Sequence, residues 1–402
     1  MKILVVNAGS SSLKYQLFDT EGYKMLAKGL CECIGIENGA IKHSAADGRE
    51  FKKNIDIPNH AEAMKLVVAA LADPTYGVIK EMSEISAVGH RIVSGGAYFT
   101  ESVLLNDEVL EKLAKCNDFA PLHTGPHIQG IKGCLSVMPD VPQVLVFDTA
   151  FHQTMPPKAY MYPIPYEMYS EDQIRRYGAH GTSHRFVSME MCKILGRTEG
   201  TKIVTCHLGN GSSISAVKDG KCIDTSMGLT PLAGVEMGSR CGDIDPAIVP
   251  RMMKKYNVGV DEINDFMNKK CGFLGVTGQS SDMRTLCGEV ENHGENYERC
   301  KLAVDILEYQ IVKYIGAYTA AMGGLDAIVF TAGIGENTVS LREHVCEQLG
   351  YLGVKLDKEA NKQGRGKISK LTTDDSKVQV YMIPTNEELM IARDTEALVL
   401  GK

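Results

Sequence analysis

The sequence lacks the features that would place this chain in a membrane or in a disulfide-bonded scaffold. Its longest apolar stretches, such as residues 66–72, fall far short of the ~20 residues that span a bilayer. The 12 Cys are scattered, Cys31 and Cys33 form the only close pair, and no Cys-x-x-Cys occurs. We therefore expect free thiols in a reducing compartment rather than zinc sites or disulfide bonds.

An excess of positive charge is also missing, because the formal net charge at pH 7 is −7. Nucleic acid is bound through a basic face that displaces its counterions, so it is not expected as the main partner. The chain begins with Met1 and Lys2 and runs directly into the strand-like residues 3–6, without the apolar segment of a secretory leader. We expect a cytoplasmic protein.

The length of 402 residues exceeds the size at which one hydrophobic core keeps growing, so two domains are expected. Strand-like and helical segments alternate, which predicts sheets covered by helices. The predicted strands include residues 85–89, 143–147, 326–331 and 378–383, and the predicted helices include residues 60–72, 243–255 and 298–322. The polar segment 355–377 is predicted to be a solvated surface excursion.

Two segments share one pattern of strand, small-residue turn and strand. The first covers residues 2–18, with Ala8-Gly-Ser-Ser-Ser12 as its turn. The second covers residues 202–217, with Leu208-Gly-Asn-Gly-Ser-Ser213 as its turn. They begin about half the chain apart, which indicates a duplicated α/β domain. Coincidence is the alternative, because a strand, a glycine turn and a strand form a common hairpin.

Glycine-rich turns are the first chemical signal in the chain. The turn at residues 7–12, followed by Lys14, offers the backbone N–H groups and the cation that a terminal phosphate requires. The second hairpin, at residues 207–213, is suited to hold the rest of a phosphate chain. A third turn, residues 331–337, follows a strand and opens a helix, as ribose or α-phosphate binding needs. None is a Walker loop, and each taken alone also suits an ordinary turn.

These three turns in this order resemble the acetate kinase family, a branch of the actin, sugar kinase and Hsp70 superfamily. The resemblance runs over essentially the whole chain. Besides the second hairpin, its carriers are Leu4-Val-Val-Asn-Ala-Gly-Ser-Ser-Ser-Leu-Lys14, Val88-Gly-His-Arg-Ile-Val-Ser-Gly-Gly96, Ala120-Pro-Leu-His-Thr-Gly-Pro126, Val146-Phe-Asp-Thr-Ala-Phe-His152, Arg176-Tyr-Gly-Ala-His-Gly-Thr-Ser-His184, Met237-Gly-Ser-Arg-Cys-Gly-Asp-Ile-Asp-Pro246 and Pro384-Thr-Asn-Glu-Glu388.

The resemblance implies an α/β fold of duplicated ribonuclease-H-like (actin-like ATPase) domains flanking a cleft. Residues 1–149 plus 386–402 would form the N-terminal domain, and residues 150–385 the C-terminal, nucleotide-binding domain. The implied reaction is reversible phosphorylation of acetate by ATP, giving acetyl phosphate and ADP, by direct in-line transfer. The implied cofactor is Mg²⁺, with Mn²⁺ as an alternative, and the implied assembly is a homodimer.

The resemblance also assigns roles to individual residues of this chain. Asp148, His180 and Arg240 would be catalytic, and Arg91, Val93, Leu122 and Pro231 would bind the substrate. Asn7 and Glu387 would hold the metal, with the adjacent Glu388 as the alternative to Glu387. The nucleotide would be bound by Lys14, His207, Leu208, Gly209, Asn210, Gly211, Asp282, Met283, Arg284, Gly333, Ile334, Gly335, Glu336 and Asn337.

The chemistry of the reaction makes sense of these residue types. Transfer of a phosphoryl group to a carboxylate brings two anions together, so cations must neutralise charge on the moving group. A carboxylate is already ionised at neutral pH, so Asp148 is expected to position groups rather than accept a proton. His180 and His184 also share the i, i+4 spacing of a zinc pair, but the Glu of a His-Glu-x-x-His motif is absent.

The sequence departs from the family pattern before His180, where Ala179 replaces the usual Phe of the acetyl pocket. A smaller side chain is expected to enlarge that pocket unless a neighbour fills the space, so propionate and butyrate would be accepted more readily. A propionate or butyrate kinase is therefore one alternative. A non-enzymatic nucleotide-binding protein, actin-like or Hsp70-like, is the other.

Overall fold

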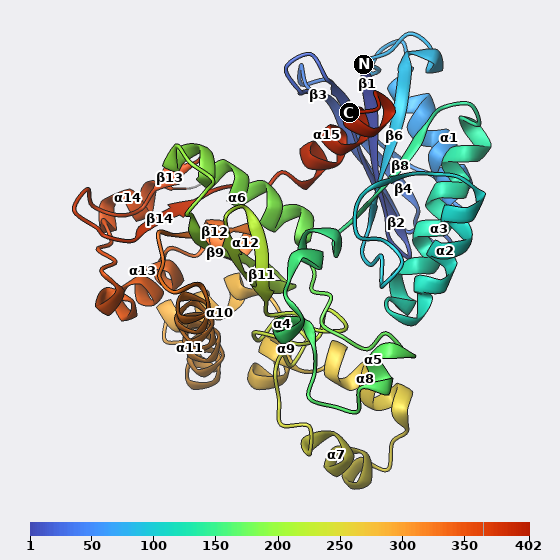
Figure 1. Cartoon of the computed structure of the whole chain (residues 1–402). Helices are drawn as coiled ribbons and strands as arrows, with labels where there is room; N and C mark the ends of the chain where they lie inside the picture. The colour runs from blue at the N-terminus through green and yellow to red at the C-terminus, as the bar shows by residue number, and fades with distance from the viewer. Residues whose placement is uncertain (365) are drawn as a thin grey trace. The chain divides into compact units, whose positions relative to one another are not determined.

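The computed structural model describes residues 1–364 and 366–402, and within them all side chains except those of Asp118, Pro121 and Leu122. The chain forms two compact units (Figure 1). Unit 1 combines Met1–Ala150 with Asn386–Lys402, and unit 2 is Phe151–Thr385. Over the described residues, no helix combines the length and the apolar character needed to cross a bilayer.

Unit 1 contains one mixed sheet with helices on both faces. Its elements are β1 (Lys2–Ala8), β2 (Ser12–Asp19), β3 (Lys24–Glu32), β4 (Ala40–Ala45), β5 (Glu50–Asn54), α1 (His60–Leu71), η1 (Met82–Glu84), β6 (Ile85–Ile92), β7 (Val103–Leu104), α2 (Asp107–Lys115), η2 (Cys116–Asp118), α3 (Pro121–Val137), β8 (Gln143–Phe147) and α15 (Glu387–Val399). The strand order is β5-β4-β3-β2-β1-β6-β8-β7.

Alternation of side chains along β1 divides the core of unit 1 between the two faces of the sheet. Leu4 and Val6 face a cluster that includes Met64 of α1. Ile3 and Val5 face a second cluster that includes Ile391 of α15. The last helix of the chain thus completes the first unit, where α15 lies beside β1 and β6 (Figure 1).

Unit 2 is built around a second sheet. Its elements are η3 (Ala150–Thr154, which begins at the boundary), α4 (Pro157–Tyr160), α5 (Glu167–Ser170), α6 (Gly181–Leu195), β9 (Lys202–Leu208), β10 (Ser212–Lys218), β11 (Lys221–Thr225), α7 (Ile248–Tyr256), α8 (Val260–Lys269), α9 (Gly272–Thr277), α10 (Met283–Glu291), α11 (Tyr297–Met322), β12 (Ala327–Thr331), α12 (Ala332–Asn337), α13 (Val339–Gln348), η4 (Gly350–Leu352), α14 (Lys358–Gln363), β13 (Ser369–Lys370) and β14 (Gln379–Met382). The strand order is β11-β10-β9-β12-β14-β13.

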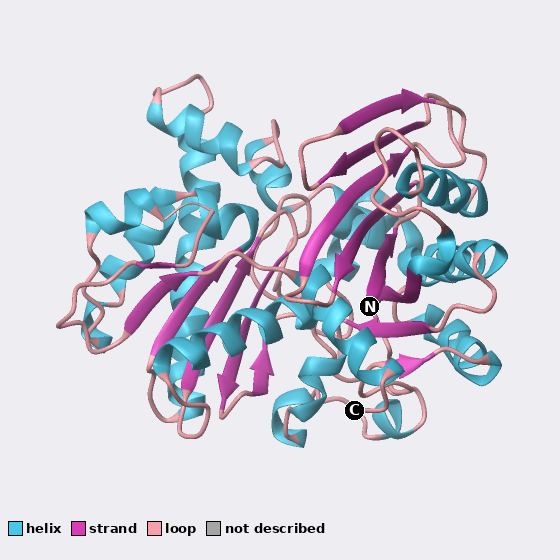
Figure 2. Cartoon of the chain, turned by 90° about the horizontal axis from the view of Figure 1, so that it is seen from above, coloured by secondary structure: helices cyan, strands magenta, loops and turns pink. Residues whose placement is uncertain are grey.

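The two sheets, drawn in magenta in Figure 2, share one pairing scheme. In unit 1 the run β3-β2-β1 is antiparallel and the run β1-β6-β8 is parallel. In unit 2 the run β11-β10-β9 is antiparallel and the run β9-β12-β14 is parallel. Five strands in the same order with the same directions agree with the duplication that the repeated hairpins predict.

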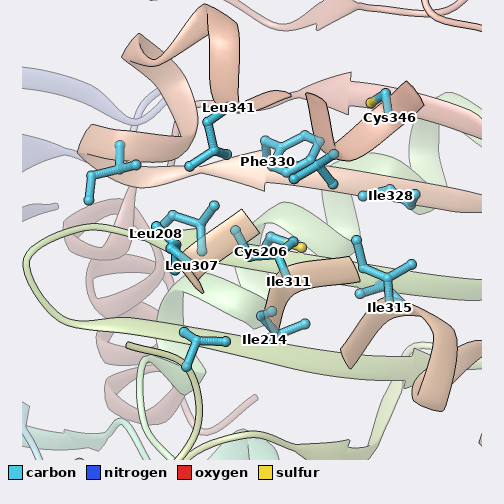
Figure 3. Close-up of a cluster of buried hydrophobic side chains, with 14 of the residues drawn as sticks. Cys206, Leu208, Ile214, Leu307, Ile311, Ile315, Ile328, Phe330, Leu341 and Cys346 are labelled. Atoms are coloured by element: carbon cyan, nitrogen blue, oxygen red, sulfur yellow. The ribbon is translucent and has the colours of Figure 1, made fainter. Parts of the chain in front are cut away.

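The main core of unit 2 lies between its sheet and the long helix α11 (Figure 3). Cys206 and Ile214 from the strands meet Leu307, Ile311 and Ile315 from the helix, at the i, i+4 spacing of one helix face. The opposite face of the same strands carries polar side chains. Thr205, His207 and Ser213 bond to residues of α6, and Ser215 bonds to His152 and Thr225.

Two sequence-based expectations need correction. Helix α7 begins at Ile248 rather than at Asp243, because Pro246 disfavours the helical conformation of the residue before it and Asp243 accepts hydrogen bonds from the Gly234 N–H and the Tyr314 hydroxyl instead. The segment 355–377 is not simply solvated. It contributes α14 and β13, and its Asn361 and Leu371 are fully buried. All twelve cysteines are free thiols.

Candidate active site

In unit 1, three parallel strands end at one edge of the sheet and present polar residues there. Val6 of β1 pairs with His90 of β6, so Asn7 and Arg91 are the next residues along these two strands. Asp148 directly follows β8, and its N–H donates to the Ile92 carbonyl oxygen at 2.8 Å. Carboxyl ends of parallel strands are where open α/β sheets place their ligand sites.

Arg91 is the centre of this group of charges. Its Nε and Nη2 donate to Asp148 Oδ2 at 3.1 and 2.8 Å, and Nη2 also donates to Glu387 Oε1 at 3.3 Å. Burial opposes the positive charge, but the carboxylates of Asp148, Glu387 and Glu388 outweigh that effect, and the pKa of Arg91 is raised. The guanidinium is therefore charged and fixed in direction.

Opposing effects act on the pKa of Glu387. Its pKa is raised to about 7, because burial and the neighbouring carboxylates of Asp148 and Glu388 raise it by more than Arg91 and Lys14 lower it. Lys14, exposed on β2, pairs with Asn7 of β1 in the sheet register. Three carboxylates face two cations in this group, an imbalance that a divalent cation would relieve.

Two histidines that the sequence analysis did not place at the site belong to the same region, where His127 is close enough to feel the charge of Arg91. The His123 and His127 rings of α3 stack with centroids 6.1 Å apart. Burial, then the charges on His123 and Arg91, lowers the pKa of His127 to about 3, and its Nδ1 is buried without a hydrogen-bond partner. Their His-x-x-x-His spacing in a helix was the only feature of the sequence that could have pointed to them.

Of the residues expected to bind the substrate, Val93 follows β6 and is half-buried, whereas the side chain of Leu122 lies outside the described part of the structure.

Unit 2 contains a cavity of about 990 Å³. It lies between the second hairpin, α10 and the segment that carries α12 and α13. The expected nucleotide residues that line it are Gly209, Asn210, Asp282, Met283, Arg284, Gly333, Ile334 and Asn337. His207, Leu208, Gly211, Gly335 and Glu336 belong to the same segments without lining the cavity, and Lys14 belongs to unit 1. Cys287, Glu291 and Glu343 line it without having been expected.

The third glycine turn is held in a strained conformation at the end of a buried strand. Ala332 has φ +64°, a left-handed conformation that costs a non-glycine residue about 1–2 kcal/mol. Arg342, fully buried, donates from Nη1 to the carbonyl oxygens of Gly335 and Glu336 at 2.8 Å and from Nε to Asn361 Oδ1 at 2.7 Å. Arg342 therefore clamps the turn, a role that no local sequence motif indicates.

A second strained residue is His180, the N-cap of α6, with φ +61°. Its ring stacks on that of His207, with centroids 4.1 Å apart and an interplanar angle of 15°. Its Nδ1 lies 2.8 Å from Ser213 Oγ, and His207 Nδ1 lies 2.8 Å from Ser183 Oγ. Strain at a residue held by buried partners is typical of functional sites.

Arg240 lies close to His180. A Cβ atom on Gly211 would lie 3.4 Å from Arg240 Nη1 and 3.5 Å from His180 Nε2, so both nitrogens approach one point beside the second glycine turn. Arg240 Nη1 also donates to the Pro231 carbonyl oxygen at 3.0 Å. The loop before Arg240 passes close to the turn, because a Cβ on Gly238 would clash with Asn210 Oδ1.

Ala179, which replaces the usual Phe of the acetyl pocket, has two methionines as neighbours. Ala179 is buried and clusters with Met227 and Met237. Met237 Sδ in turn lies 3.9 Å from Arg240 Nη1. Two flexible thioether side chains thus surround the small residue, and methionine adapts readily to irregular space.

The repeated sheet topology is that of the actin-like ATPase fold class. The charged group in unit 1 and the cavity beside the glycine turns in unit 2 suit an enzyme that transfers phosphoryl groups. The chain belongs to the acetokinase family, whose model matches residues 2–393. It is 57% identical to an acetate kinase of Caldanaerobacter subterraneus subsp. tengcongensis, over 100% of both chains.

Solved structures agree with this assignment. An acetate kinase of Porphyromonas gingivalis superposes with a TM-score of 0.94 at 43% identity, covering 99% of each chain. A propionate kinase of Francisella tularensis superposes with a TM-score of 0.91 at 40% identity, covering 99% of each chain. The alternative of a non-enzymatic actin-like or Hsp70-like protein is not favoured, because these full-length relatives are kinases.

Proposed function

We propose that this protein catalyses the reversible transfer of the γ-phosphoryl group of ATP to acetate, giving acetyl phosphate and ADP, by direct in-line attack. The observation that carries the proposal is the full-length likeness to acetate kinases, at 57% identity in one case. The positive charges on Arg91 and Arg240 and the ring of His180 agree with it, since phosphoryl transfer between two anions depends on positioned cations and N–H donors.

Each site residue has its own role in this reaction. Arg91, oriented by Asp148, binds the carboxylate of acetate. Val93 and Pro231 line the pocket around its methyl group. Lys14 and the glycine turns bind the phosphates, while the cavity in unit 2 holds the rest of the nucleotide. His180 and Arg240 donate to the phosphoryl oxygens as charge develops on them. Asp148 accepts two hydrogen bonds from Arg91, so it acts as an orienting carboxylate rather than as a base.

Kinases of this class use a divalent metal, and the residues of unit 1 suit Mg²⁺. The amide of Asn7 and the carboxylate of Glu387 are oxygen ligands, and the excess of carboxylates around Arg91 favours an added cation. Among the described residues no cluster of three or more His, Cys, Asp or Glu forms a metal cage. Mg²⁺ does not require one, because it is usually bound by one or two protein carboxylates together with substrate phosphates and water. Bound Mg²⁺ would neutralise phosphate charge.

The activity is tested by incubating the protein with ATP, Mg²⁺ and acetate in the presence of hydroxylamine, which traps acetyl phosphate as a hydroxamate. We expect hydroxamate that depends on ATP, on acetate, on Mg²⁺ and on the protein. The reverse reaction, ATP formation from ADP and acetyl phosphate, should proceed as well. Absence of product in both directions from folded protein would refute the proposal.

The size of the acyl group is the second part of the proposal. Because Ala179 stands where the family usually has Phe, we expect kcat/KM for propionate to lie within about tenfold of that for acetate. An Ala179→Phe variant should lower the propionate value by a further ~10-fold or more relative to acetate, since one methylene changes discrimination by ~1–3 kcal/mol. Steady-state kinetics with acetate, propionate and butyrate measure this.

An Ala179→Val variant serves as an intermediate in size for the same assay. If the wild type already discriminates against propionate by tens of times, the methionines fill the space and the idea of an enlarged pocket is wrong. Because a propionate kinase is also similar to this chain, the ratio of kcat/KM for acetate to that for propionate is informative whichever acid is preferred.

We also propose that the protein acts in the cytoplasm as a homodimer. Twelve free cysteines agree with a reducing compartment. Light scattering on the eluate of a sizing column should give about twice the 43.8 kDa of one chain.

A further inference from the structure

A buried series of hydrogen-bonding side chains leads from the sheet of unit 2 to His180. Thr205 of β9, His184 of α6 and Ser213 of β10 are each 0% exposed. Thr205 Oγ1 lies 2.7 Å from His184 Nδ1, His184 Nε2 lies 2.7 Å from Ser213 Oγ, and Ser213 Oγ lies 2.8 Å from His180 Nδ1. We propose that Ser213 and His184 are positioning residues that keep His180 neutral with its proton on Nε2.

Counting protons along the series limits the possible states. A hydroxyl group has one proton to donate, and a neutral imidazole has one N–H. Burial, then the neighbouring His152 and His207, lowers the pKa of His184 well below its usual value, so this ring is neutral near pH 7. Its single proton therefore lies either on Nδ1, facing Thr205, or on Nε2, facing Ser213.

Thr205 decides between these two states. Its hydroxyl can donate to His184 Nδ1 at 2.7 Å or to the Ser215 carbonyl oxygen at 3.5 Å, at the limit of a hydrogen bond. If His184 donated to Thr205 instead, the buried hydroxyl proton of Thr205 would have only the Ser215 carbonyl oxygen, at 3.5 Å, as its acceptor. A buried donor without a good acceptor is costly, so Thr205 donates to Nδ1. The proton of His184 is then on Nε2 and is donated to Ser213 Oγ.

Ser213, having accepted from His184, still has its own proton. It can donate to His180 Nδ1 at 2.8 Å or to the Ala179 carbonyl oxygen at 3.2 Å. The second distance exceeds the range of about 2.5–3.0 Å that is usual for a hydroxyl donor, so His180 Nδ1 is the better acceptor for this buried proton. His180 Nδ1 is then an acceptor, and the proton of its neutral ring is on Nε2. In the opposite state of His184, Ser213 would have to donate to His184, and His180 would carry its proton on Nδ1.

In this tautomer the N–H of His180 points from Nε2 toward the second glycine turn. His180 Nε2 and Arg240 Nη1 approach the same point beside Gly211. Two N–H donors there would both face the oxygens of a transferring phosphoryl group, which gain charge in the transition state. A lone pair on Nε2 would repel those oxygens. This catalytic consequence rests on the proposed function, whereas the tautomer of His180 does not.

The tautomer can be read directly by NMR on the unmodified protein. Histidine labelled with ¹⁵N, in a long-range ¹H–¹⁵N correlation spectrum at pH 7.5, distinguishes a protonated from an unprotonated ring nitrogen. A His180→Asn variant assigns the signal. We expect a protonated Nε2 and an unprotonated Nδ1 for His180. A proton on Nδ1, or on both nitrogens, would overturn the proposal.

Kinetics test the part played by Ser213. A Ser213→Ala variant removes the donor to Nδ1, and we expect kcat to fall about 100-fold with KM for ATP and acetate nearly unchanged, the pattern of a weakened transition-state donor. Ser213→Thr keeps the hydroxyl and should recover most of the loss. Ser215→Ala is the matched control, because Ser215 is equally buried on the same face of β10 but contacts Thr225 and His152 instead.

The outcomes separate this proposal from the proposed function. If Ser213→Ala and Ser215→Ala behave alike and the His180 signal is the same in both, the positioning role is wrong while the kinase activity stands. If the wild type makes no hydroxamate but shows a protonated Nε2, the kinase proposal fails and the hydrogen-bond series stands. Should Ser213→Ala not fold, the wild-type spectrum still decides the tautomer.

Discussion

An Arg91→Leu variant is expected to lose at least ~10³-fold in kcat/KM for acetate, because it removes both the partner of the substrate carboxylate and a cation at the reacting group. The same change should destabilise unit 1. It leaves Asp148, with only 2% of its side chain exposed, and Glu387, with 15%, without their cation. Breaking a buried ion pair by removing one partner costs about 3–5 kcal/mol.

Steady-state kinetics and urea unfolding followed by circular dichroism measure these two effects. An Arg91→Lys variant keeps the charge without the two-pronged contact to Asp148, so it should recover stability better than activity. Arg49→Leu is the control for stability, because Arg49 pairs with Asp47 at the surface, where solvent screens the pair, and its loss should cost much less than the loss of Arg91. Equal losses for Arg49→Leu and Arg91→Leu would contradict the assigned role of burial.

Replacing Glu236 by glutamine should stabilise unit 2 at neutral pH. Glu236 is 3% exposed, neither carboxylate oxygen has a hydrogen-bond partner, and burial raises its pKa from 4.5 to about 8. The carboxyl of Glu236 therefore binds its proton more tightly in the folded protein than in the unfolded chain. Below about pH 4.5 the carboxyl is protonated in both states and costs nothing.

As the pH rises from about 4.5 to about 8, the unfolded chain releases the proton while the folded chain keeps it, so stability falls across this window. At pH 7 the cost is about 3 kcal/mol, from ~1.4 kcal/mol for each pKa unit. Glu236→Gln removes that dependence. The difference between the urea midpoints of variant and wild type should therefore grow from pH 5 to pH 8 and then level off.

A Glu171→Gln variant at an exposed position is the matched control and should follow the wild-type curve. Parallel curves for Glu236→Gln and wild type between pH 5 and pH 8 would mean that Glu236 has a partner when the protein is in solution. Glu236 lies one residue before the loop that leads to Arg240, and its N–H donates to Gln310 Oε1 at 2.6 Å, so an activity assay at each pH belongs beside the unfolding curves.

The local sequence determined the elements that carry glycine and hydrophobic patterns. Both hairpins, the buried strands at 143–147 and 327–331 and the long helix α11 form where small-residue turns and apolar spacing predict them. The start of α7 was missed because Asp243 bonds to residues distant in sequence, Gly234 and Tyr314, and so does not start the helix. The burial of Leu371 was missed for the same kind of reason, since its core partners come from other elements.

The class of the protein and the types of residue in its site followed from motifs that resemble one kinase family, and the repeated topology followed from the spacing of two similar hairpins, because motifs and spacing are local features of the chain. Only the tertiary structure decided that Asp148 and Glu387 both hold Arg91, that Arg342 clamps the third glycine turn and that Ser213 lies between two histidines. Hydrogen bonds and desolvation act over a few ångströms, and residues that are tens or hundreds of positions apart in the chain reach such distances only after folding.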